Sequence, residues 1–539
     1  MAVVIENQEQ SPPFPSIAEI LIELGFVIVS MRLLAALNKA LVYFEKGWDS
    51  PLRFIGPFVV CLAFSVYFHR VRYAQLAPML RFVVRSSALG ILVYLVLEWP
   101  EFTLANENAV NAFHYIVFGS YLTFLLALTS LFIPSFILPV VVFILSTRYL
   151  SPGISGMPAP IFDVRFMLDM AAYLCLFALP VVAFASRLPP YFRDPMRHTE
   201  LAFAAFGLHL GNYFWSGVAK LQIGPHPWTW ILENQTHKTM LYALENGTLP
   251  IGHIPWLVDH IYSTAGFLVI PLNFSIVAFQ LFAIVCVFRM SWLKITSIFY
   301  DIFHAGIYIL GGLFFWPWVW NNFTILLSAS RQRTEVSLMA KLMCVLVILL
   351  GDVSGFPRSA RLAWFDVTDV RRTYFQAVTS DGRTLAVPPS FFLTHSFGVS
   401  QGYMDMAAHE GQYRPTIWAS AATYDRQLSS GTCPAPGPID PKLVETEQKR
   451  EERLDTVKHF VRAQHEKMKA REAIFGADNF YFRSHHHPSN PFLFSEFNRL
   501  NLKDVVAYNL VVESACLRLD HGKVEKTVVN RVVDRFDVE

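Results

Sequence analysis

Apolar runs dominate this chain from residue 17 to residue 353 and restrict it to a small set of folds. A membrane hydrocarbon core of about 30 Å needs roughly 20 apolar residues in a helix, and a helix satisfies its own backbone hydrogen bonds. With 53% hydrophobic and 16% charged residues, the composition excludes an ordinary soluble protein. We therefore expect a polytopic α-helical membrane bundle in contact with membrane lipid, with spans at 17–37, 52–69, 77–98, 109–130, 132–149, 165–185, 200–222, 256–288, 295–327 and 336–353.

The distribution of lysine and arginine predicts how the spans are oriented. Loops 70–76 and 187–198 are basic, whereas loop 99–108 contains no basic residue. Because basic loops stay in the cytoplasm, the N-terminal segment 1–16 is predicted to be cytoplasmic and the helical domain to cover 17–355. The loop 223–255 then lies outside, where Trp228 and Trp230 are expected to anchor the interface. No basic stripe with interleaved aromatic residues is present, so the sequence does not favour a nucleic-acid partner.

The composition becomes charged and polar after Gly355, which predicts a C-terminal extramembrane domain at 356–539. Residues 361–393 alternate apolar and polar side chains around Asp381-Gly382, a pattern typical of a β-hairpin. Residues 448–470 have the charge pattern of a solvated helix, and residues 504–538 would add strands or a short helix. The predicted fold class is thus a polytopic helical membrane bundle with a C-terminal β-rich (α+β) soluble domain.

Cysteine and histidine residues in this domain raise the questions of disulfide and metal binding. Cys433 and Cys516 would pair if the domain faces an oxidising compartment. His485, His486 and His487 are consecutive, so they cannot all face one ion from a regular element, and no Cys-x-x-Cys or His-Glu-x-x-His pattern occurs. We therefore predict no metal site.

One polar stripe in the helical domain is a candidate ligand-binding or catalytic site. In a helix over 209–222, the side chains of His209, Tyr213, Ser216 and Lys220 lie along one side, and Gly217 allows a neighbouring helix or flat ligand to approach closely. A lysine within a span is unfavourable, so Lys220 requires an explanation. Either its ammonium reaches the headgroups and caps the helix, or the residue has a chemical role.

Two histidines lie in other spans. His114 belongs to the sequence NAFHYIVFG, and His304 begins the sequence HAGIYILGG. An intramembrane histidine can serve as a hydrogen-bonding residue in helix packing, and for His304 the partner would be Asp301 or Tyr300 on the same helix. Both histidines are also candidates for a functional site.

The motif YFWSGVAKL at 213–221 resembles the Tyr-Phe-x-x-Gly-Val-x-Lys-Leu segment of the vitamin K-dependent γ-glutamyl carboxylase and the related horizontally transferred transmembrane domain (HTTM) proteins. In that family the lysine deprotonates a reduced quinone, a role that the resemblance gives to Lys220. The carboxylase has a second lysine at the position of Ala219.

Three further segments carry the same resemblance. Asn111, His114 and Gly119 match the family's asparagine-rich turn, histidine and glycine, so His114 would hold the quinone oxygen. His304 matches a Phe-His segment, and Trp364 with residues 381–384 resembles the lumenal β region. His114 and Lys220 are farther apart in sequence than in the carboxylase, by about two spans.

The resemblance implies an integral-membrane enzyme that couples oxidation (epoxidation) of a reduced vitamin K-like quinone by O2 to proton abstraction and carboxylation of glutamyl side chains by CO2. Lys220, His114 and His304 would be catalytic, and Tyr213, Ser216, Gly217 and His209 would bind the cofactor. It also implies an extracytoplasmic C-terminal domain and a glutamate-containing peptide or protein as substrate. A membrane pocket suits this chemistry because desolvation favours a neutral, basic amine and excludes water.

Alternatives to this function remain open. The chain would also fit a quinol- or lipid-dependent enzyme of the same fold with another acceptor, or a non-catalytic membrane module with the tail as its binding domain. Transport is less favoured, because no pair of broken helices occurs in matching halves. The enzyme interpretation predicts that His114, Lys220 and His304 converge on one pocket near the outer leaflet.

Overall fold

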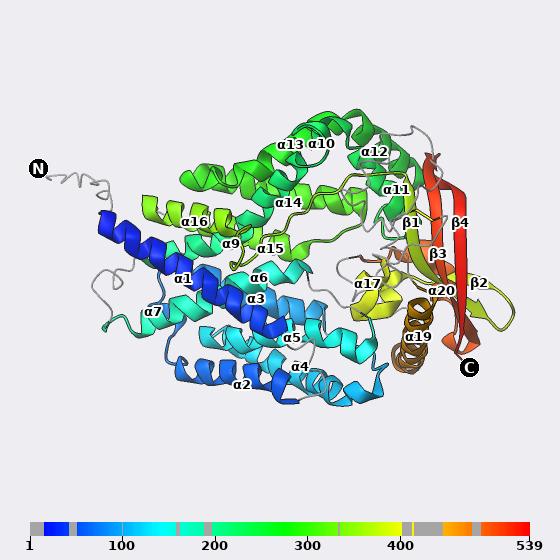
Figure 1. The fold of residues 1–539 in the computed structure, drawn as a ribbon, viewed down its shortest axis with the longest axis horizontal. Helices are drawn as coiled ribbons and strands as arrows, with labels where there is room; N and C mark the ends of the chain where they lie inside the picture. Colours follow the sequence, from blue (N-terminus) through cyan, green and yellow to red (C-terminus); the bar gives the residue numbers. More distant parts are fainter. Residues whose placement is uncertain are drawn as a thin grey trace, which may run out of the picture.

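The fold of the chain is given by a computed structural model that describes residues 16–42, 51–99, 101–157, 162–187, 197–332, 335–400, 412–413, 446–476 and 487–538. Long helices run side by side, and a β-sheet stands at one end of the bundle, opposite the end where helix α1 begins (Figure 1). The predicted class, a helical membrane bundle with a C-terminal β domain, is confirmed.

The helical domain consists of α1 (Ile17–Val42), α2 (Pro51–Tyr67), α3 (Pro78–Leu97), α4 (Val110–Ser130), α5 (Ile137–Ser155), α6 (Phe162–Tyr173), α7 (Leu179–Ala183), α9 (Arg197–Leu221), α10 (Thr229–Glu233), α11 (Thr239–Glu245), α12 (Pro255–Phe267), α13 (Val269–Phe282), α14 (Met290–Gly311), α15 (Trp316–Arg331) and α16 (Leu338–Leu350). Within the described ranges, six helices are long and apolar enough to cross a membrane, and the bent pair α12–α13 would be a seventh span. Helix α9 is long enough, but its polar stripe makes it less apolar than these.

The centre of the bundle is formed by α5, α6 and α9. Nearly every side chain of α5 is buried, including the run Val140, Val141 and Val142, and the first half of α9 is buried on all sides. A helix that is apolar all round belongs in a core, since no face needs to meet water. The polar stripe of α9 is also buried, since none of its four members, His209, Tyr213, Ser216 and Lys220, is more than 3% exposed.

Two predicted spans are corrected by the structure. The run 295–327 is not one helix: α14 ends at Gly311 and is capped by Gly312, which has a positive φ of 65°, and α15 starts anew with Pro317 in its first turn. The run 256–288 bends by 71° between α12 and α13. The two helices α14 and α15 pack together as a hairpin.

The last predicted span, 336–353, is a short helix followed by extended chain. Helix α16 ends at Leu350, and residues 356–368, which we call the strap, run from the middle of the bundle to the sheet (Figure 1). Irregular backbone within a helical membrane bundle is tolerated only where protein covers it and satisfies its hydrogen bonds. The strap meets this condition, because Asn212 accepts from the amide of Ala360 at 2.7 Å and Ser216 from that of Leu362 at 2.9 Å.

The C-terminal domain is built on an antiparallel sheet with strand order β2-β1-β3-β4, formed by β1 (Asp369–Thr379), β2 (Thr384–Ala386), β3 (Val505–Asp520) and β4 (Lys523–Asp537). The predicted hairpin is confirmed: β1 pairs with β2, and Gly382 takes a φ of 83° in the turn. The predicted helix is α19 (Glu447–Phe475), and residues 504–538 form strands. Phe460 and Val461 of α19 pack into the domain core with Phe375 and Phe392.

Three residues with predicted roles in this domain, Cys433, His485 and His486, lie outside the described residues. Pairing of Cys433 with Cys516 therefore stays a prediction. His487 is buried at the edge of the domain, beside Ser489 and Asn490. In the part of the chain that the structure describes, no group of three or more His, Cys, Asp or Glu side chains could hold a metal ion.

Candidate functional site

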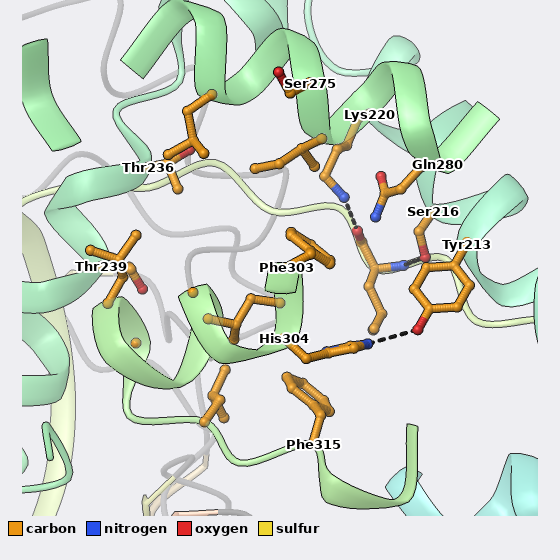
Figure 2. Close-up of a pocket in the computed structure, with 18 of the residues that line it drawn as sticks. Tyr213, Ser216, Lys220, Thr236, Thr239, Ser275, Gln280, Phe303, His304 and Phe315 are labelled. Atoms are coloured by element: carbon orange, nitrogen blue, oxygen red, sulfur yellow. Dashed lines mark hydrogen bonds between the residues drawn. The ribbon is translucent and has the colours of Figure 1, made fainter. Parts of the chain in front are cut away.

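A cavity of about 360 Å³ lies between α9, α13, α14 and the strap. Its wall is mostly apolar and includes Ile276 of α13, Phe303 of α14 and Trp364 of the strap. Among the residues with a predicted role, Tyr213, Ser216, Lys220 and His304 line this cavity. Figure 2 shows Tyr213, Ser216 and Lys220 following one another along α9, with His304 approaching Tyr213 from α14.

The amine of Lys220 is buried at one end of the cavity. The residue is 3% exposed, and its Nζ donates to the backbone oxygen of Leu362 at 2.6 Å. Two indole rings flank it, with Nζ 5.2 Å from the ring centre of Trp230 and 5.6 Å from that of Trp364. No carboxylate of the described residues lies within the 4 Å that defines an ion pair with this amine. Lys220 therefore does not reach out to the headgroups as an anchor.

The strap sets the position of this amine. Ser216 binds the strap through two hydrogen bonds. Its Oγ accepts from the amide of Leu362 at 2.9 Å and donates to the oxygen of Ala360 at 3.3 Å. Farther along, Trp230 Nε1 donates to the oxygen of Trp364 at 2.6 Å. Leu362 and Trp364 are two residues apart in extended chain, so both face the cavity.

A buried hydrogen-bond array supports His304 at the other end of the cavity. His304 Nε2 lies 2.8 Å from the hydroxyl of Tyr213, which also contacts the side-chain amide of Asn322 on α15. Asn322 is bonded to Asp301 at 2.9 Å and to His209 at 2.9 Å. His209 is thus part of the support and does not line the cavity.

Gly217 has a packing role at this site. A Cβ atom at this position would lie 3.0 Å from Cβ of Gln280 and 3.2 Å from Leu281 on α13. The missing side chain therefore lets α9 and α13 approach each other beside the cavity, as the sequence suggested. Gly217 does not line the cavity itself.

His114 does not belong to this site, and the prediction of a pocket shared by three residues is wrong for it. His114 is exposed on α4, on the same stripe as Phe118, Tyr121 and Leu125, which are 70%, 63% and 59% exposed. Spacings of four, three and four place these residues on one helix face, and that face points out of the bundle. Gly119 faces the other way, since a Cβ there would collide with the ring of Phe143 of α5.

The cavity reaches the outer surface of the helical domain along α14. Ile302 lines the cavity and is 64% exposed, and a Cβ on Gly306, which also lines it, would meet no atom within 4 Å. Neighbouring residues on this surface, Ile298 and Phe274, are exposed and apolar. The opening therefore faces the region that lipid would occupy around a membrane bundle.

Beyond the strap end of the cavity lies a polar group that sequence reasoning missed. Asp366 is 3% exposed and accepts from Asn234 Nδ2 at 3.0 Å, and its own backbone amide donates to Asn234 Oδ1 at 2.7 Å. Burial raises the pKa of Asp366 to about 7, while the hydrogen bond from Asn234 and the charge of Lys220 oppose that rise. The strap therefore brings a carboxyl group with a raised pKa close to the lysine.

Several other functional positions were not predicted. Trp230 was expected at the membrane interface but is 2% exposed and lines the cavity. Trp228 is 55% exposed, and its place at the interface stays a prediction. Asn321 and Asn322 were recognisable as polar residues within an apolar run, which signals a role. Leu362 acts through its backbone, for which the sequence carries no signal.

Comparison with known proteins gives no relative for this chain: no family model, no curated protein and no solved structure matches it.

Proposed function

We propose that this protein is an integral-membrane enzyme that binds a reduced quinone in the cavity and uses Lys220 to remove a proton from it. The observation that carries the proposal is the position of the Lys220 amine. It lies in an apolar cavity with one hydrogen donated to Leu362, and no carboxylate of the described residues is within ion-pair distance. In a neutral amine that hydrogen bond leaves the nitrogen lone pair available to accept a hydroxyl proton.

The cavity fits a quinone ring in four respects. Its volume, about 360 Å³, falls in the range of small-molecule sites, and its wall is mainly apolar and aromatic. Its opening beside Ile302 and Gly306 faces the lipid region, which suits a ligand with an apolar tail. His304 contributes Nδ1, a buried polar atom that no hydrogen bond of the described residues satisfies.

In this proposal each residue that lines the cavity end has its own role. Lys220 takes the proton, His304 binds an oxygen of the ring, and Trp230 and Trp364 keep water from the amine. When bound, the reduced quinone supplies electrons for reaction with O2, and the resemblance to the carboxylase family implies that this oxidation drives carboxylation of glutamyl side chains by CO2.

We also propose that the C-terminal domain is extracytoplasmic. Ten spans from a cytoplasmic N-terminus would return residue 356 to the cytoplasm, so this proposal requires that one of the predicted spans is not a single crossing. The division of the run 295–327 into α14 and α15 makes that run the candidate. Labelling of a cysteine introduced near Asp381 tests this placement in intact cells. Labelling only after lysis would contradict it.

Analysis of the lipid that copurifies with the protein tests the main proposal. A quinone should be recovered from the purified protein, and Lys220→Ala should abolish quinol oxidation with partial rescue by a small amine. Lys220→Arg should also be inactive, because guanidinium stays protonated. Lys294→Ala, which removes a half-buried lysine of α14 outside the cavity, is the matched control. Turnover retained in Lys220→Arg, or the absence of any bound quinone, would refute the assignment.

A further inference from the structure

Asp301, Asn322 and Tyr213 form a chain of hydrogen bonds that ends on His304, and the chemistry of each group restricts the next. Asp301 Oδ1 lies 2.9 Å from the side-chain nitrogen of Asn322. A carboxylate accepts hydrogen bonds and donates none, so Asn322 must direct Nδ2 toward Asp301 and Oδ1 away from it. Asp301 therefore fixes the orientation of the Asn322 amide.

The histidine on the far side of Asn322 agrees with this orientation. Asn322 Oδ1 lies 2.9 Å from His209 Nε2, and because an amide oxygen only accepts, His209 carries its hydrogen on Nε2. His209 Nδ1 is then an acceptor, and Asn321 Nδ2 lies 3.3 Å from it as a donor. Four groups thus satisfy one consistent set of donors and acceptors.

The same orientation decides the direction of the bond to His304. Asn322 Nδ2 donates to the Tyr213 oxygen at 2.9 Å, which leaves the hydroxyl hydrogen of Tyr213 for another acceptor. His304 Nε2 is the nearer acceptor at 2.8 Å, since the alternative, Asn322 Oδ1, lies 3.1 Å from the hydroxyl. A neutral imidazole that accepts at Nε2 carries its hydrogen on Nδ1.

The hydrogen bonds of this array leave His304 Nδ1 without a partner. The ring lines the cavity and is 4% exposed, and Nδ1 has no hydrogen-bond partner among the described residues. Leaving a buried N–H group without a partner is unfavourable, so such a group is rarely retained unless a ligand or water satisfies it.

We infer that Asp301, Asn322 and Tyr213 are positioning residues that hold neutral His304 with its hydrogen on Nδ1, so that the cavity presents a fixed N–H donor to an oxygen of its ligand. The identity of that ligand as a quinone rests on the proposed function. A donor fixed in advance stabilises the negative charge that develops on the ring oxygen when Lys220 removes the proton. The two ends of the cavity thus have complementary tasks, with a proton acceptor on α9 and a hydrogen-bond donor on α14.

The tautomer of His304 is measurable without any ligand, which separates this inference from the proposed function. The full chain, with ¹⁵N-labelled histidine and reconstituted in lipid bilayers, should give a solid-state NMR signal for an Nδ1–H imidazole that disappears in His304→Phe. The double variant Asp301→Asn with Asn322→Asp keeps the charge and shape of the array but reverses its polarity. The Tyr213 hydroxyl then donates to the carboxylate at 322, and the signal should change to the Nε2–H form.

A second measurement tests the donor toward the ligand. A naphthoquinone labelled with ¹³C at its carbonyl carbons should show one infrared carbonyl band shifted to lower frequency on binding, and the shift should be lost in the double variant. Tyr308→Phe, which removes a hydroxyl from the same helix outside the cavity, is the control and should retain it.

The outcomes of the two measurements are distinct. An Nε2–H signal for His304 in the natural protein, or an Nδ1–H signal that persists in the double variant, would overturn the inference. An Nδ1–H signal that responds to the double variant, with no carbonyl shift for the naphthoquinone, would support the array and refute the quinone as ligand. Both effects together would support the inference and the proposed function.

Discussion

The replacement Ser216→Ala should loosen the strap without changing the shape of α9. In the natural protein the Ser216 hydroxyl accepts from the Leu362 amide at 2.9 Å and donates to the Ala360 oxygen at 3.3 Å. Alanine leaves the amide buried without a partner, which costs about 1–3 kcal/mol. The second bond is longer and adds less. We therefore expect the free energy of unfolding to fall by about 1–3 kcal/mol.

Ser275→Ala is the matched control because it removes the same group from the same cavity. Ser275 lines the cavity from α13, but its hydroxyl donates only to the Pro271 oxygen of its own helix, at 2.8 Å. That oxygen can also accept a backbone hydrogen bond of the helix, so it does not depend on the hydroxyl. Its loss should change the free energy of unfolding by less than about 0.5 kcal/mol. The two variants together separate the strap bonds from the general effect of a hydroxyl.

Thiol labelling provides the assay, since Cys61, Cys175, Cys286 and Cys344 are free and buried in the helical domain. A dye that fluoresces on reaction with thiols reports their exposure as the detergent-solubilised protein unfolds on heating or in denaturant. Ser216→Ala should shift the transition to lower temperature and denaturant concentration, and Ser275→Ala should not. Equal shifts for both variants, or none for Ser216→Ala, would refute the structural role of the strap bonds.

Three further predictions concern other parts of the fold. Gly312→Ala should destabilise the protein by at least about 1–2 kcal/mol in thermal unfolding, because φ is 65° and a Cβ would lie 2.6 Å from the Thr248 oxygen, whereas Gly306→Ala, in open space, should be neutral. Burial lowers the pKa of Lys467 to about 7, so between pH 7 and about 10.4 the unfolded chain binds more protons than the folded chain. The free energy of unfolding should therefore rise with pH in this window, by up to about 1.4 kcal/mol per pH unit. Unfolding curves of Lys467→Met should lack this slope. Burial raises the pKa of Asp366 to about 7, so the folded chain binds more protons between pH about 3.9 and 7; stability should fall as pH rises through that window, and unfolding curves of Asp366→Asn should lack the trend.

Local patterns in the sequence were sufficient for the elements of the fold but not for every boundary. The hairpin around Gly382 and helix α19 follow from turn residues and charge spacing, which act over a few neighbours. The break between α14 and α15 was missed because the surrounding residues are as apolar as a continuous span. Only Gly312 and Pro317 mark it, and a Gly-Gly pair followed by Pro is a recognisable end and start of two helices.

The candidate site was predictable where its residues share one helix. Tyr213, Ser216 and Lys220 lie on one face of α9 by spacing alone, and the structure places that face on the cavity. His114 shows the limit of this reasoning, since a short motif on a helix does not reveal which face is turned inward. The apolar residues at its stripe, Phe118 and Tyr121, are as compatible with lipid as with a core.

The strap explains why the cavity could not be derived from the sequence and why it depends on the C-terminal domain. Extended backbone in lipid leaves amide and carbonyl groups unsatisfied, at several kcal/mol each. Here those groups form hydrogen bonds with three side chains of α9, those of Asn212, Ser216 and Lys220. The polar stripe that was predicted as a ligand site is therefore also the surface that binds the strap. The oxygen that holds the Lys220 amine belongs to this strap, which continues directly into β1. A displacement of the sheet would therefore move the hydrogen-bond partner of Lys220 with no change in α9 itself.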